Sequence, residues 1–168
     1  FLAFAEIFGD ERLSNNSLLT SVQTATLPQS VVVNEIMYAP TGDEPEWVEL
    51  FNNTSDSIDL INWKISDNNF GTKILVTTES KILSPQSYVV LAKDTVLFNT
   101  IHTNISSILF QVSQLPSLNN SGDAVVIYDA GEVTVDSVNY LPQWGGSTGG
   151  KSLERIFSDS VSHDSMNW

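Results

Sequence analysis

Residues 31–38 read VVVNEIMY and residues 46–52 read EWVELFN, with the loop APTGDEP between them. Val and Ile favour extended backbone and Pro and Gly interrupt it, so both runs predict strands. The second strand is not cleanly amphipathic, because Trp47 and Glu49 fall on the same face. We therefore expect Glu35 and Glu49 to be partly covered. A covered carboxylate needs a cation or hydrogen bonds, such as those from backbone N–H groups of nearby loops.

The same pattern continues along the chain. Further runs rich in Val and Ile predict strands at 73–78, 87–93, 123–129 and 132–140. Residues 95–99 favour no more than a short helical turn. The triplet Asp129-Ala130-Gly131 predicts a hairpin in which Gly131 supplies a positive φ, and Ser84-Pro85-Gln86 predicts a second turn. Short strands separated by polar turns indicate an all-β sandwich or barrel.

Composition restricts the classes of function. Hydrophobic residues make up 41% of the 168 residues, which is enough for one folded main domain. Asp and Glu number 20 against 7 Lys and Arg, and the net charge of -13 opposes binding to nucleic acid and to anionic lipid surfaces. The absence of Cys excludes disulfides, thiolate metal sites and cysteine nucleophiles. No apolar run approaches the ~20 residues that span a bilayer, so no membrane insertion is expected.

A composition shift at residues 28–30 predicts a boundary. We expect residues 1–27 to be the tail of a preceding module or a linker strand, and residues 31–168 to form the main domain. The string GDERLSNNSLLTSVQT in the first piece resembles the closing hairpin of an immunoglobulin-like module of the CARDB kind.

From residue 31 the segments VVVNEIMYAP, EWVELFN, IDLINWKISD, LSPQSYVVLA, LNNSGDAVVIYDAG, VDSVNY, GKSLERI and a closing NW follow one another. Together they resemble the lamin-tail domain family, especially its bacterial forms, over residues 31–168. The resemblance implies an immunoglobulin-like β-sandwich without catalytic residues, which binds partners or spaces domains in a larger secreted or cell-surface protein.

The positions that carry the resemblance have structural interpretations. Asn52 is expected to end its strand and bond nearby backbone, and Trp63, flanked by Leu60, Ile61 and Ile65, is expected in the core. The motif positions expected to be structural are Asn34, Glu35, Trp47, Glu49, Asn52 and Trp63.

Two patterns could carry chemistry. Residues 145–149, GGSTG, match the nucleophile pattern G-x-S-x-G and are followed by Asp159 and His163, but an all-β chain lacks the strand-turn-helix that this motif requires. A Gly-rich loop is the favoured interpretation, and we expect no enzyme activity. Calcium is the more plausible ion, because acidic loops offer hard oxygen ligands. Its candidate ligands are Asp43, Glu44, Glu46, Asp56, Asp59 and Asp67.

The partner is expected to be a protein or a glycan, and exposed sheet edges could also support a homodimer. The alternative function is that of a carbohydrate-binding module attached to an extracellular hydrolase. That function requires at least two coplanar exposed rings, for which Trp144, Tyr140 and Phe70 are the candidates.

Overall fold

The computed structural model describes residues 2–4, 17–19, 26–103, 105, 107–145 and 149–168. Within the first piece, β1 (Leu2–Phe4) and β2 (Ser17–Leu19) pair antiparallel. The prediction that residues 1–27 end a preceding module falls mostly outside the described residues and stays a prediction. None of the described helices is long and apolar enough to cross a membrane.

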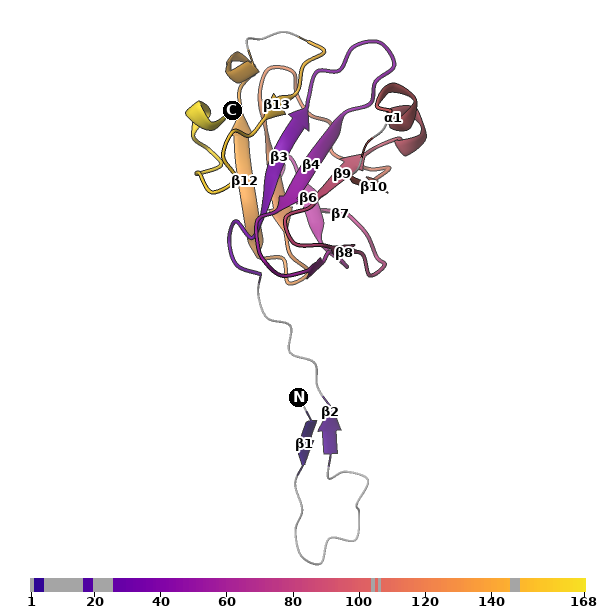
Figure 1. Cartoon of the computed structure of the whole chain (residues 1–168), viewed down its shortest axis with the longest axis vertical. Helices are drawn as coiled ribbons and strands as arrows, with labels where there is room; N and C mark the ends of the chain where they lie inside the picture. Colours follow the sequence, from indigo (N-terminus) through magenta and orange to yellow (C-terminus); the bar gives the residue numbers. More distant parts are fainter. Residues whose placement is uncertain (1, 5–16, 20–25, 104, 106, 146–148) are drawn as a thin grey trace, which may run out of the picture.

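Two sheets stack face to face in the main body of the molecule (Figure 1). The five-stranded sheet runs in the order β10 (Ile108–Gln111), β9 (Tyr88–Ala92), β4 (Trp47–Asn52), β3 (Val31–Met37) and β13 (Leu153–Glu154). The four-stranded sheet runs in the order β12 (Thr134–Tyr140), β11 (Asp123–Tyr128), β6 (Lys64–Ser66) and β7 (Ile74–Leu75). The strands pair antiparallel except β10 with β9, which are parallel. The predicted all-β sandwich is confirmed.

Several short elements complete the sandwich. They are β5 (Ile58–Asp59), which pairs with β8 (Ile82–Leu83), the helix α1 (Thr95–Ile101), and the 3-10 turns η2 (Pro142–Gly145) and η3 (Ser165–Asn167). The predicted turn at 95–99 is a two-turn helix, because the Asp94 side chain caps it by accepting the Leu97 N–H at 2.9 Å. The predicted strand at 73–78 is shorter than expected, with pairing limited to β7.

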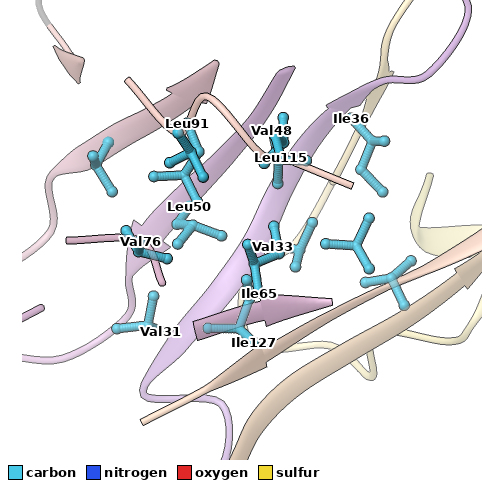
Figure 2. Packing of buried hydrophobic residues seen from close by; sticks show 14 of the residues in the cluster. Val31, Val33, Ile36, Val48, Leu50, Ile65, Val76, Leu91, Leu115 and Ile127 are labelled. Carbon is cyan, nitrogen blue, oxygen red and sulfur yellow. The ribbon is translucent and has the colours of Figure 1, made fainter. Parts of the chain in front are cut away.

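The core fills the space between the two sheets. Alternate residues of facing strands meet there, among them Val31, Val33, Leu50, Ile65 and Ile127 (Figure 2). Burying each such side chain contributes about 1.5–3 kcal/mol relative to exposure. This layer holds the two sheets together.

A β-bulge in β3 changes which residues face the core. The register of β3 against β4 shifts between Val33 and Glu35, so Asn34 is the extra residue. Val33 points into the core, Glu35 lies on the outer face opposite Glu49, and Ile36 points inward again. The bulge explains why three consecutive valines precede a charged position in the middle of a strand.

The β11–β12 hairpin corrects one sequence prediction. Glu132, at φ 65°, has the positive φ, and Gly131 does not. The Asp129 side chain accepts the Val133 N–H at 2.9 Å, and the Glu132 carboxylate pairs with Lys64 and Lys73. These contacts hold Glu132 in a conformation that a glycine would adopt without strain. The second predicted turn is present, and Gln86 has φ 52° there.

Candidate binding surface

The sandwich has two sides where edge strands of different sheets face each other. The closed side lies between β12 and β13, and the open side lies between β7 and β10. Edge strands present unpaired backbone groups, so the sides are where a sandwich of this kind is either sealed or available to a partner. The two sides differ in what fills them.

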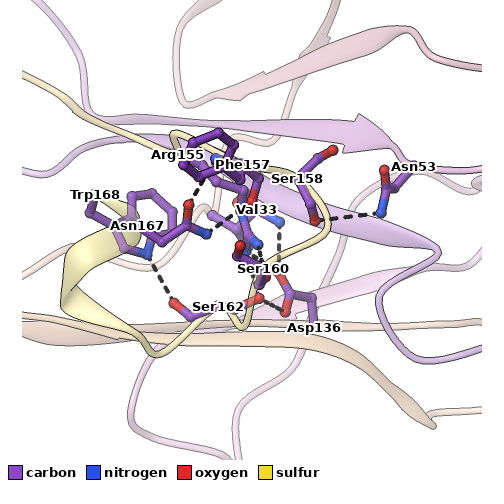
Figure 3. Close-up of polar contacts among 10 residues, drawn as sticks. All are labelled: Val33, Asn53, Asp136, Arg155, Phe157, Ser158, Ser160, Ser162, Asn167 and Trp168. Carbon is purple, nitrogen blue, oxygen red and sulfur yellow. Dashed lines mark hydrogen bonds and ion pairs between the residues drawn. The ribbon is translucent and has the colours of Figure 1, made fainter.

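A buried arginine seals the closed side (Figure 3). Arg155 follows β13, and its Nε donates to the Val33 carbonyl at 2.8 Å while Nη1 donates to the Ser160 carbonyl at 3.0 Å. Its Nη2 contacts Asp136 Oδ2 at 3.1 Å and also donates to Ser162 Oγ. Asp136 in turn accepts the Val33 N–H at 2.8 Å. We call Arg155, Asp136, Ser162 and their bonds to Val33 the Arg155 clamp.

The clamp joins the two sheets, because Val33 belongs to one and Asp136 to the other. The side chains of Arg155 and Asp136 are almost fully buried, at 0% and 3% exposure. Burial lowers the pKa of Arg155, and the Asp136 carboxylate opposes that shift. A buried charge pair is tolerated when its remaining donors and acceptors are satisfied. Among the described residues no buried side-chain nitrogen or oxygen lacks a hydrogen-bond partner.

The C-terminal segment covers the clamp. The Trp168 indole donates to the Ser162 carbonyl at 2.9 Å, and its ring lies 5.3 Å from the Arg155 guanidinium carbon (Figure 3). Asn167 is buried and bonds both the N–H and the carbonyl of Phe157, at 2.8 and 3.0 Å. Sequence reasoning quoted the segments SLERI and NW but assigned Arg155 no role. The available signal was a cation directly after the short strand Leu153–Glu154.

The open side carries a groove. One cavity of about 320 Å³ is lined by residues 73–75 and 111–114, and a second of about 300 Å³ by Val76, Thr77, Lys81 and residues 108–111. Both are lined by Gln111, so the two cavities adjoin along the open side, and we call them together the open-side groove. Leu75 and Ile108 are 44% and 42% exposed. Among the described lining residues, Lys73 and Lys81 are charged and none is acidic.

Three glutamates form a row on the outer face of the five-stranded sheet. Glu154, Glu35 and Glu49 are register partners across β13, β3 and β4. Burial raises the pKa of both Glu35 and Glu49, and neighbouring glutamates add to this. The prediction that both are partly covered is confirmed, since each is of intermediate exposure.

The hydrogen bonds to these carboxylates come from side chains, which corrects the expected backbone donors. Ser152 Oγ donates to Glu35, while Asn34 Nδ2 and Ser107 Oγ donate to Glu49 at 3.0 and 3.2 Å. The cause is the bulge, which places the Asn34 amide beside Glu49. These bonds oppose the effect of burial on both carboxyl pKa values.

The other motif positions are structural. Trp63 is 2% exposed and packs in the core as predicted. Asn52 is fully buried, and its amide donates to the carbonyls of Asp56, Leu83 and Ser84 at 2.8–3.0 Å. Trp47 packs on Phe98 of α1, so it is covered on the outer face of the sheet.

The calcium candidates lie in separate places. Glu44 accepts from the Trp47 indole at 3.1 Å and contacts His102 Nε2 at 2.6 Å. Glu46 pairs with Lys93 at 3.0 Å. Asp59 bonds Ser80, Ile61 and Lys81; burial would raise its pKa, but these bonds outweigh burial and lower it. Asp67 accepts the Asn69 N–H, while Asp43 and Asp56 are exposed.

Across residues 26–103 and the later described segments, no three acidic or histidine side chains converge as a metal site. The structure therefore brings none of the six candidates into a common ligand set.

The three rings expected to form a sugar platform lie in different surroundings, and Phe70 is 57% exposed. Tyr140 is buried in the core, so it is removed from the sugar platform, and Trp144 packs against Trp168 with ring centres 6.2 Å apart. The serine of the G-x-S-x-G match lies outside the described residues. Asp159 bonds Asn53 at 3.1 Å, and His163 is exposed.

The chain matches the sequence model of a known family over most of its length. Residues 24–142 match the sequence model of the Lamin Tail Domain family. This segment contains the strands from β3 to β12, and β13 extends the same sheet by pairing with β3. No curated protein matches the chain.

Proposed function

Because the chain belongs to the lamin tail domain family, an immunoglobulin-like fold, we propose that it is a non-catalytic interaction module of a larger secreted or cell-surface bacterial protein. The family match is the observation that carries this proposal. The buried polar groups support it, because they form hydrogen bonds within the sandwich. The motif residues and the Arg155 clamp hold the sandwich together. The open-side groove remains as a surface for a partner.

We propose a protein as the partner. The net charge of -13 opposes nucleic acid, and the ring set expected for a glycan loses Tyr140 to the core. A groove between two edge strands suits a polypeptide, which can bond backbone as well as side chains. Spacing of neighbouring domains is compatible with the same role.

The cellular location can be tested with an epitope inserted in the exposed loop at Gly42 and Asp43. Gly42 has open space around it, so an insertion there should leave the fold intact. Antibody labelling of intact cells that express the full-length protein is expected to equal labelling of permeabilised cells. Labelling that requires permeabilisation would contradict a surface location.

The interaction role can be tested by amine-reactive cross-linking of the full-length protein on intact cells. Lys73 and Lys81 line the open side, whereas Lys151 is exposed just before β13. An interaction module is expected to yield reproducible cross-links from a fixed subset of its lysines to another polypeptide or domain. Complete absence of such links from a labelled surface protein would contradict the role.

Calcium binding stays a prediction from the acidic loops. Thermal unfolding of the chain in calcium and in chelator is the direct measurement. A calcium-dependent rise in Tm would assign the ion a site, and equal values would remove calcium from the account.

A further inference from the structure

The open-side groove has the chemistry of a peptide site, an inference that deepens the proposed interaction function. We propose that the groove binds an extended acidic segment of a partner protein. The segment would pair with the free edge of β10 and place carboxylates against Lys73 and Lys81.

The backbone of β10 supplies the first argument. β10 ends the five-stranded sheet and pairs with β9 along one edge. A terminal strand leaves the N–H and C=O groups of its other edge for a new strand, which is how many domains capture extended peptides. β7 ends the opposite sheet and forms the other wall of the groove.

The walls supply the second argument. Ile74, Leu75 and Val112 line one cavity, while Val76, Ile108 and Phe110 line the other. Phe110 and Val76 are buried, and Leu75 and Ile108 remain half-exposed beside them. An extended peptide directs alternate side chains to one face. The cavity lined by Leu75 and Val112 offers an apolar seat for such a side chain, whereas the surface of the cavity lined by Ile108 is mainly polar.

Charge selects the partner. Acidic residues outnumber basic ones 20 to 7 in the chain, yet the described residues that line the groove include two lysines and no acid. Lys73 pairs with Glu132 at 3.0 Å and Lys81 with Glu79 at 3.2 Å, and these glutamates are 50% and 76% exposed. Such exposed pairs contribute about 0–1 kcal/mol. The Lys73 ammonium also lies 4.2 Å from the centre of the Tyr128 ring, so a peptide carboxylate would have to reach it at the edge of β7.

A second copy of this chain is a poorer occupant. Each copy carries a formal charge of -13, so two copies repel each other as whole molecules. A short acidic segment carries much less total charge than a second copy, and its carboxylates would interact mainly with the two lysines of the groove.

The test is selection of a phage-displayed random dodecapeptide library on the purified chain. Whole-molecule charge alone would enrich basic peptides. The proposal expects the opposite: enriched peptides that alternate Asp or Glu with apolar residues. Enrichment of basic peptides would overturn it.

Synthetic copies of the enriched peptide give the quantitative test. The double variant Lys73→Glu/Lys81→Glu is expected to bind about tenfold or more weakly, and N-methylation of alternate peptide amides is expected to abolish binding. The matched variant Lys151→Glu has the same type of charge change outside the groove and should bind within about twofold of the parent. Equal affinity of both variants would overturn the proposal. Unchanged Tm of the double variant checks its fold.

Failure of this proposal is separable from failure of the proposed function. Cross-links from Lys151 without links from Lys73 or Lys81 would leave an interaction module but overturn the groove as its site. A concentration-dependent dimer in sedimentation that is abolished by Lys73→Glu/Lys81→Glu would make a second copy the occupant and overturn the acidic peptide.

Discussion

The closed and open sides of the sandwich are built from equivalent parts, since each joins an edge strand of one sheet to an edge strand of the other. On the closed side a buried arginine bonds both sheets and the C-terminal segment covers it. On the open side two lysines remain at the rim of a groove and pair with exposed glutamates. The difference indicates a division of labour, in which one side stabilises the fold and the other side stays available.

The largest expected effect comes from breaking the Arg155 clamp. Arg155→Met leaves Asp136 as an uncompensated buried carboxylate and is expected to cost about 3–5 kcal/mol of unfolding free energy. The open-side counterpart, Lys73→Met, should cost less than about 1 kcal/mol because its partner is exposed. Urea unfolding of both variants provides the comparison.

The double variant Arg155→Met/Asp136→Leu is the control for this prediction. It removes both buried charges and is expected to recover most of the lost stability. Equal costs for the two single variants would contradict a stabilising role specific to the closed side.

A smaller effect is expected at the cover of the clamp. Asn167→Ala removes two hydrogen bonds to the Phe157 backbone, each contributing about 0.5–1.5 kcal/mol, and should cost about 1–3 kcal/mol. On the open side Gln111→Ala should change stability by no more than about 0.5 kcal/mol, because Gln111 is exposed. Chemical denaturation of the pair tests the ranking, which a larger loss at Gln111 would reverse.

The smallest effects concern pH, and they differ in sign between Glu35 and Glu132. The acidic row begins at β13, and the folded state raises the pKa of Glu35 mainly by burial. Above the ordinary value of 4.5 the folded state therefore holds more protons than the unfolded state, so unfolding free energy falls as pH rises through that window. Glu35→Gln removes this effect and should stabilise the chain at pH 7 by about 0.2–1 kcal/mol.

Glu132 in the β11–β12 hairpin, which pairs with Lys73, provides the opposite case. Lys64 and Lys73 lower its pKa, so its stabilising contribution is present above the ordinary value of 4.5 and is lost as pH falls through the lowered value. Glu132→Gln should therefore lower stability at neutral pH. Thermal unfolding of both variants between acid and neutral pH measures the signs, and the same sign for both would refute this assignment.

The features that were predicted correctly from the sequence are those that depend on local residue patterns. β-branched runs identified the long strands, the apolar surroundings of Trp63 placed it in the core, and Asn52 was expected to bond nearby backbone. The calcium candidates, the cellular location and the partner remain predictions, because no observation tests them.

What the sequence missed depends on contacts between distant residues. Arg155 bonds residues 122 and 19 positions away, and the bulge at Asn34 depends on the register against β4. Glu132 has the positive φ in this turn, where Asp129 bonds the next residue and Lys64 and Lys73 pair with the Glu132 carboxylate. The prediction that Gly131 would supply the positive φ was therefore wrong. The groove lies between β7 and β10, which end different sheets, and no local sequence pattern indicates that these two strands lie side by side.

Native-state hydrogen exchange at low, rising denaturant tests the division of labour most directly. The amides of Val33 and Arg155, which donate to Asp136 and Asn34, should exchange only with global unfolding. Amides on the free edge of β10 should exchange at much lower free energy. The account predicts this asymmetry, and equal protection of the two sides would contradict it.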